Sequence, residues 1–112
     1  MSDEVLVDGQ VPTIRNDADN HRYVIEVDGD VLGRIDYRVR GTDVALTHTE
    51  VDQARSVPGL ARRLVDEVLA DLRSRGAGVL PYCPYVKKLI DENRAEYIDL
   101  VPEDRRGEFD LG

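Results

Sequence analysis

Apolar and polar residues alternate through the first half of the chain with the period of two that is typical of β-strands. The alternation begins at residues 23–27 and is followed by Asp28-Gly29, a strong hairpin signal because both residues accept the positive φ of a primed turn. The chain returns through residues 31–39, where Gly33 predicts a β-bulge, and makes a third run at 44–51. The pattern predicts three antiparallel strands in a meander.

A helical period replaces this alternation after a loop at residues 52–59 that contains Pro, Gly and several polar residues. Apolar residues then recur every four positions, as in an amphipathic helix, at Leu60, Leu64, Val68 and Leu72. Ser56 is the predicted N-cap, Pro58 is expected in the first turn, and Gly76 is the expected stop signal.

The last third of the chain is less regular. Residues 78–83 predict a short strand, and Pro84 predicts the start of a second helix that ends near Asn93. Residues 97–101 are expected to form a last extended piece, and residues 103–112 are expected to be a charged tail.

A strand, a long helix and another strand in succession predict one parallel crossover added to the antiparallel meander. The expected fold class is therefore α/β, or more narrowly an α+β fold with a mixed sheet and few elements. We expect a single domain over residues 1–112, with its core at about 20–101 and loose ends at 1–11 and 103–112.

Composition narrows the classes of function. The net charge of −8 argues against binding to nucleic acid or to an anionic membrane, because phosphate contacts need a basic face. One cysteine excludes an internal disulfide, the first residues are acidic where a signal peptide would be basic, and no run reaches the roughly 18 apolar residues of a membrane helix. We therefore expect a cytoplasmic protein.

The loop before the long helix is the first candidate binding site. A glycine-containing loop at a helix N-terminus presents free backbone N–H groups and the positive end of the helix dipole, which suit a phosphate or pyrophosphate. Arg55, Arg62 and Arg63 lie around this loop. The alternative is an ordinary strand–helix connection with solvated arginines.

Cys83 and His48 are the candidate catalytic residues. Cys83 lies between a predicted strand and a predicted helix, where a helix dipole can lower a thiol pKa, although a lone cysteine is also a common buried apolar residue. His48 is suited to proton transfer near neutrality and can approach Cys83 if their strands are neighbours; otherwise it is a half-exposed strand residue. No spacing typical of a metal site occurs, and no metal is expected.

The segment from Asn20 to Val101 resembles the small, single-domain branch of the GCN5-related N-acetyltransferases. The resemblance rests on five ordered pieces: Val27-Asp28-Gly29 with Gly33 and Tyr37, Leu46-Thr-His-Thr-Glu-Val51, Gly59-Leu-Ala61, Pro81-Tyr-Cys-Pro-Tyr85 and Glu96-Tyr-Ile-Asp-Leu-Val101. It implies a sheet that opens to admit acetyl-coenzyme A as co-substrate, and an amine acceptor on a small molecule or a protein.

The resemblance also implies roles for particular residues. Those expected to bind the coenzyme are Thr49, Glu50, Val51, Val57, Gly59, Leu60, Ala61, Arg62, Tyr85 and Lys87, and those expected to act in catalysis are Cys83 and His48. His48 would remove the amine proton, and Cys83 would accept the acetyl group or protonate the departing thiolate.

The sequence departs from the family pattern in the coenzyme loop. Ser56 stands where the family has Arg or Gln, and Val57-Pro58 replace a usual Gly and a polar residue, whereas the small Ala61 is kept. A non-catalytic acyl-coenzyme A-binding or protein-interaction domain with the same fold is therefore the alternative to an N-acetyltransferase.

Overall fold

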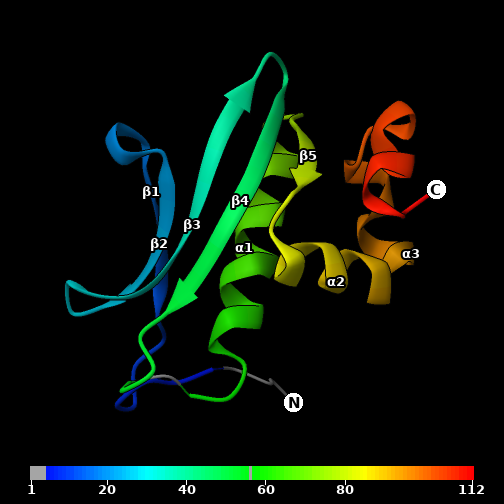
Figure 1. The fold of residues 1–112 in the computed structure, drawn as a ribbon. Coiled ribbons are helices and arrows are strands. Elements are labelled where there is room, and N and C mark those ends of the chain that lie inside the picture. The colour runs from blue at the N-terminus through cyan, green and yellow to red at the C-terminus, as the bar shows by residue number, and fades with distance from the viewer. Residues whose placement is uncertain (1–4, 56) are drawn as a thin grey trace.

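The computed structural model describes residues 5–55 and 57–112, which form a five-stranded sheet with helices around it (Figure 1). The strands are β1 (Thr13–Asp17), β2 (Arg22–Val27), β3 (Asp30–Arg40), β4 (Asp43–Val51) and β5 (Gly78–Pro81). The α-helices are α1 (Leu60–Ser74), α2 (Pro84–Glu92) and α3 (Arg94–Tyr97), and the 3-10 helices are η1 (Ala18–Asn20), η2 (Ile98–Leu100) and η3 (Glu103–Phe109). The predicted mixed sheet is confirmed.

The sheet order β1-β2-β3-β4-β5 follows the chain, with antiparallel pairing from β1 to β4. The hairpin predicted at Asp28-Gly29 is confirmed, and both residues have the positive φ of a primed turn, 51° and 80°. The predicted bulge is one residue from Gly33: Leu32 is the extra residue, because Ile25 pairs with Gly33 and Glu26 pairs with Val31. The sequence prediction missed β1, a fourth antiparallel strand on the far side of β2.

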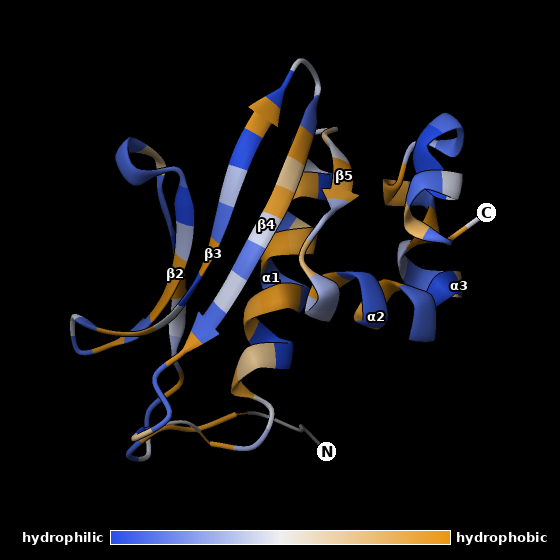
Figure 2. Ribbon diagram, in the orientation of Figure 1, coloured by the Kyte–Doolittle hydropathy of each residue, from blue (hydrophilic) through white to orange (hydrophobic). Residues whose placement is uncertain are grey.

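The predicted crossover is also confirmed, since α1 leads from β4 to β5 and these two strands are parallel. Helix α1 packs one hydrophobic stripe under the sheet, as the hydropathy colouring of Figure 2 shows, through Leu60, Leu64, Val65, Val68, Leu69 and Leu72. At 15 residues it is the longest described helix. Within residues 5–55 and 57–112, no helix is long and apolar enough to cross a membrane.

Two tyrosines fasten α1 to elements on either side of it. Tyr23 of β2 donates a hydrogen bond to Asp71, and Tyr97 of α3 donates one to Asp66 at 2.5 Å. Burial, together with these carboxylates, raises the pKa of both phenols above the ordinary range. Each tyrosine thereby adds a buried polar contact to the apolar packing of the helix.

The C-terminal third differs from the sequence prediction after α2, which does begin at Pro84 as expected. The extended piece predicted at 97–101 is wrong, because α3 and η2 occupy this region and Tyr97 is buried. The tail predicted to be loose is folded into η3, with Phe109 and Leu111 buried in the main core. Two apolar residues among many charges are too weak a signal to reveal this docking from sequence.

The N-terminal segment is also less loose than predicted. Within its described part, Val7 is 2% exposed and belongs to the main core, and it forms a backbone bridge with Gln10. The segment therefore covers one end of the sheet next to the start of α1.

Candidate active site

Strand β4 changes its strand partners and its polarity at a β-bulge on Thr47. Tyr37 of β3 pairs with Leu46, whereas the next residue back, Asp36, pairs with His48, so Thr47 is the extra residue. Before the bulge, β4 pairs with both β3 and β5; after it, the described partners are on β3 alone. Figure 2 shows the accompanying change from hydrophobic to hydrophilic residues along the strand.

The pairing of β4 with β5 ends in a fork. The last pair is Leu46 with Pro81, and the backbone N–H of Cys83 closes the paired part by donating to the Leu46 carbonyl at 2.8 Å. The chain then turns into α2 at Pro84, while β4 continues to Val51 (Figure 1). Within the described residues, the edge of residues 48–51 that faces away from β3 has no strand partner.

Cys83 lies at this fork as the N-cap residue of α2. It is 4% exposed, and its Sγ lies 3.2 Å from the Thr49 hydroxyl oxygen. The Lys87 N–H donates to the Cys83 carbonyl at 3.0 Å, which fixes the thiol at the start of the helix. The structure thus brings together two of the predicted site residues, Cys83 and Thr49.

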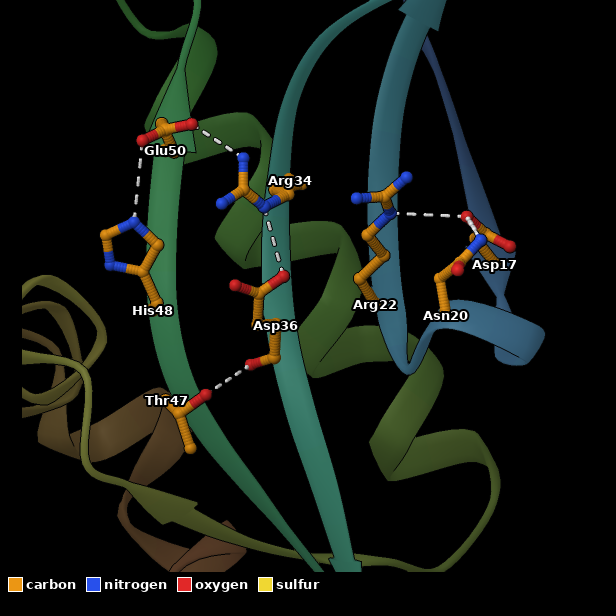
Figure 3. A network of polar contacts seen from close by, with 8 residues as sticks. All are labelled: Asp17, Asn20, Arg22, Arg34, Asp36, Thr47, His48 and Glu50. Atoms are coloured by element: carbon orange, nitrogen blue, oxygen red, sulfur yellow. Dashed lines mark hydrogen bonds and ion pairs between the residues drawn. The ribbon is translucent and has the colours of Figure 1, made fainter.

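His48 lies on the opposite face of β4 from Cys83. Its Nε2 is 3.7 Å from Oε1 of Glu50, and both side chains point to the open face of the sheet, away from α1 (Figure 3). The Thr47 bulge is the physical cause, because one extra residue inverts the faces to which the following side chains point. The structure therefore does not place the predicted pair His48 and Cys83 on one face.

A polar network that the sequence prediction missed surrounds His48 (Figure 3). Arg34 of β3 donates to Glu50 at 2.6 Å and to Asp36 at 3.1 Å. The hydrogen bond and the charge of Arg34, and to a smaller extent the nearby His48, lower the pKa of the Glu50 carboxyl below its usual range. The period-two pattern places these charges on one face of β3, but only the register with β4 sets Arg34 opposite Glu50.

The predicted phosphate loop enters α1 through Gly59, which has a φ of 86° that favours glycine. Leu60 N–H donates to the Val57 carbonyl at 3.1 Å, so this predicted donor already has a partner. The N–H groups of Ala61 and Arg62 lie in the first helical turn, before the ladder of the helix begins. Ser56, the predicted N-cap, lies outside the described residues; the N-cap is Gly59.

The arginines around this loop have partners of their own. Arg55 pairs with Asp8 and Asp30 at 3.0 and 2.9 Å, which ties the loop to the N-terminal segment and to the β2–β3 turn. The others make pairs one helical turn ahead: Arg62 with Asp66 and Arg63 with Glu67. The Nε of Arg63 is nonetheless buried without a hydrogen-bond partner in the described part of the chain.

Two recesses flank the first turns of α1 and α2. One of about 510 Å³ is lined by Val5, Gly59, Arg62, Arg63, Asp66 and Glu67, and one of about 160 Å³ is lined by Arg62, Tyr85, Lys88, Leu89 and Glu92. Tyr85 thus lines the same recess as Arg62, and burial raises the pKa of its phenol. Lys87 points elsewhere, since its ammonium group lies 3.4 Å from Asp110 in the C-terminal segment.

Comparisons with known proteins agree with the fold. The family described as GCN5-related N-acetyl-transferase matches residues 22–100. A GCN5-like protein from Staphylococcus aureus, solved by NMR, superposes with a TM-score of 0.59 and 20% identity over 80% of this chain and 87% of its own. At that identity the superposition supports the fold alone.

A sequence relative places a similar segment in a longer protein. The chain is 39% identical over 82 residues to the cell-division control histidine kinase PdhS of Brucella anthropi, covering 69% of this chain and 7% of that protein. The match to the family over residues 22–100 includes every strand from β2 to β5. The chain belongs to the GCN5-related N-acetyltransferase family.

Proposed function

We propose that the protein is an acetyl-coenzyme A-dependent N-acetyltransferase whose co-substrate binds in the fork between β4 and β5. The observation that carries this proposal is the end of β4–β5 pairing at Leu46, which leaves a free strand edge beside a buried thiol. A pantetheine arm contains two amide groups, and an unpaired strand edge offers them backbone hydrogen bonds. Membership of the family supports the same ligand.

The residues on either side of the fork determine which end of the coenzyme lies near Cys83 and which lies near α1. The free edge at Thr49, Glu50 and Val51 leads toward the loop at Val57–Arg62, where backbone N–H groups and the dipole of the 15-residue helix α1 suit a pyrophosphate. The thioester then lies at the inner end of the fork, near Cys83. Tyr85 lies beside the start of α1, within reach of the rest of the coenzyme.

We assign His48 as the general base and Cys83 as the general acid of one direct acetyl transfer. The acceptor amine attacks the thioester carbonyl carbon from the open face of the sheet, and His48 takes the proton that the amine loses. The carbon–sulfur bond then breaks, and Cys83 donates its proton to the departing thiolate from the other face. Glu50, 3.7 Å from His48, stabilises the imidazolium that forms. The placement of the two residues on opposite faces favours this direct transfer over an acetyl-cysteine intermediate.

Titration calorimetry with acetyl-coenzyme A, dephospho-coenzyme A and adenosine diphosphate tests the binding site. We expect saturable micromolar binding that requires the pantetheine arm. Absence of heat and of thermal stabilisation at millimolar acetyl-coenzyme A would refute the proposal.

The catalytic assignment is tested with Cys83→Ala. We expect the variant to bind acetyl-coenzyme A with unchanged affinity and to lose about 100-fold in kcat, a typical contribution of general acid–base catalysis. Intact-protein mass spectrometry of the wild type with acetyl-coenzyme A alone should detect no acetylated Cys83. An acetylated cysteine that transfers its group to an added amine would contradict direct transfer.

A non-catalytic acyl-coenzyme A-binding domain is the second candidate. It is favoured by the loop before α1, where Leu60 N–H and the side chain of Arg55 already have partners within the chain. Tight binding of acetyl-coenzyme A without coenzyme release on any amine would support this candidate.

A further inference from the structure

A large cavity lies on the open face of the sheet, beside the β4 bulge. Its volume is about 760 Å³, within the range of ligand sites, and we call it the basic recess. The recess exists because β2 begins at Arg22, opposite Asp36, whereas β3 runs on to Arg40 with β4 as its partner. The turn around η1 forms one wall, where His21 makes an edge contact with the ring of Tyr37.

Four arginines and one carboxylate are the charged residues that line the basic recess: Arg22, Arg34, Arg38, Arg40 and Asp36. Arg22 is paired with Asp17, and Arg34 is paired with Asp36 and Glu50. The side chains of Arg38 and Arg40 have no ion-pair or hydrogen-bond partner within residues 5–55 and 57–112. In a chain of net charge −8, two arginines without a partner on one strand face are a local reversal of sign.

The residues across the strand do not neutralise this pair. Arg38 faces Ala45 in the register with β4, and Arg40 faces Asp43. The Asp43 carboxylate leans toward Gly78, where an added Cβ would lie 2.3 Å from its Oδ1. Two adjacent guanidinium groups are therefore available to an anion, and carboxylates are a good match for their forked N–H donors.

The spacing along β3 indicates what kind of anion fits. Asp36 lies opposite His48, and Arg38 and Arg40 follow two and four residues later on the same face, about 7 and 14 Å away at the rise of a strand. An amine at His48 and a carboxylate at these arginines are thus separated by two to four residues of extended peptide. A free α-amino acid is too short to place its amine and carboxylate at both points.

The edge of β3 next to the recess favours the same occupant. The N–H of Tyr37 donates to the His21 carbonyl, and beyond this bond residues 38–40 have no described partner on the β2 side. Val39 is 59% exposed there. Extended peptides bind to such edges through main-chain hydrogen bonds, with side-chain contacts supplying specificity.

We propose that the basic recess binds an extended acidic peptide segment, held by Arg38 and Arg40, and that this segment carries the amine to be acetylated. The inference rests on the proposed N-acetyltransferase function, whose acceptor it defines. The amine-bearing residue reaches the bulge at Thr47, and acidic residues two to four positions along the peptide reach the arginines.

The test compares three peptides with free N-termini that differ only at their third and fifth positions, which carry glutamate, glutamine or lysine. We expect kcat/KM to be about tenfold higher for the glutamate peptide than for the glutamine peptide, and the ratio to fall with salt. Arg38→Gln with Arg40→Gln should remove the preference, with a much larger fall in kcat/KM for the glutamate peptide than for the glutamine peptide. Arg15→Gln, on the edge strand β1, is the matched control and should keep the preference.

Charge reversal separates recognition from a structural effect. Arg38→Glu with Arg40→Glu should favour the lysine peptide, an outcome that a loss of folding cannot produce. Equal rates for all three peptides, or an equal loss for the glutamate and glutamine peptides in the double glutamine variant, would overturn the inference. If free glutamate were acetylated with the same kcat/KM as the glutamate peptide, the proposal that the recess binds a peptide would be wrong.

Failure of the proposed function gives a different pattern. If acetyl-coenzyme A does not bind, that function fails and the acceptor role fails with it, whatever peptides bind. If acetyl-coenzyme A binds and all peptides are acetylated alike, the function stands and the inference alone is wrong. Fluorescence anisotropy of the labelled peptides measures their binding without the coenzyme, and absence of the same charge preference there would also overturn the inference.

Discussion

The two halves of β4 are adjacent in the chain and differ in almost every physical respect. Residues 44–46 are buried and lie between β3 and β5. The side chains of His48 and Glu50 are more than half exposed, and among the described residues this part of β4 pairs with β3 alone. The Thr47 bulge separates the halves and inverts the faces to which the side chains point. The first half therefore serves the core, and the second half is free to bind and to react.

This difference indicates where the protein tolerates amino-acid substitutions. In the first half, each side chain is packed on all sides, so removal of a few methyl groups leaves a cavity. In the second half, the strand edge and the polar side chains contact solvent, so substitutions there affect the site more than the fold. Three changes test this division, from the largest expected effect on stability to the smallest.

Leu46→Ala tests the buried half. Leu46 is 0% exposed at the last β4–β5 pair, so the substitution should lower the free energy of unfolding by about 2–5 kcal/mol through lost burial and the resulting cavity. Urea denaturation measures the change. Val39→Ala, on the exposed end of β3, is the control and should stay within about 0.5 kcal/mol. Similar losses for both variants would show that the division is false.

Gly33→Ala tests the contact between β3 and the second half of β4. A Cβ on Gly33 would lie 2.9 Å from the Glu50 carbonyl oxygen and 3.3 Å from Cγ2 of Val51, so the two strands would have to separate. We expect a loss of about 1–3 kcal/mol in thermal unfolding, as for other overpacked sites. Gly107→Ala, where no heavy atom lies within 4 Å, should leave stability unchanged within about 0.5 kcal/mol. An unaffected Gly33 variant would mean that the close approach of the strands is not real.

Arg34→Gln tests the polar network of the exposed half. Because Arg34 is the largest cause of the lowered pKa of Glu50, its removal should raise that pKa toward the ordinary value, as followed by NMR titration of the carboxyl carbon. A lowered pKa stabilises the fold at pH values above the carboxyl's unfolded pKa, and this contribution disappears as pH falls through the folded pKa. The loss should be small, since the pair is exposed. Arg15→Gln should not shift the Glu50 titration, and a Glu50 pKa equal in wild type and Arg34→Gln would contradict the assignment.

Much of the fold was predictable because its signals are local. The Asp28-Gly29 turn, the four-residue repeat of α1 and Pro84 at the start of α2 each correspond to the observed element. Strand β1 was missed because its five residues are mostly polar and show no clear alternation. Residues 97–101 are mostly apolar and were expected to be extended, but residues 97–100 fold as helix. Tyr97 bonds to Asp66, and Arg106 donates to the carbonyls of Ile98 and Val101.

Two predicted site residues lie together in the structure, but the geometry of the candidate site could not be predicted from the sequence. Cys83 does lie between a strand and a helix at the fork, and Thr49 lies beside it. The expectation that His48 would approach Cys83 rested on their strands being neighbours. Strands β4 and β5 are neighbours, but the bulge turns His48 to the opposite face. A bulge depends on the register of two strands, and the basic recess depends on where β2 starts relative to β3. Neither feature can therefore be predicted from a local sequence pattern.

The central claim is that the unpaired half of β4 forms the edge on which acetyl-coenzyme A binds. Amide hydrogen exchange by NMR, with and without acetyl-coenzyme A, tests it residue by residue. Protection should rise at the first turn of α1 and at those amides of residues 49–51 whose N–H points away from β3, and should stay unchanged at residues 44–46, which are already paired on both sides. Binding that leaves residues 49–51 unprotected, or that protects a different face of the protein, would contradict the account.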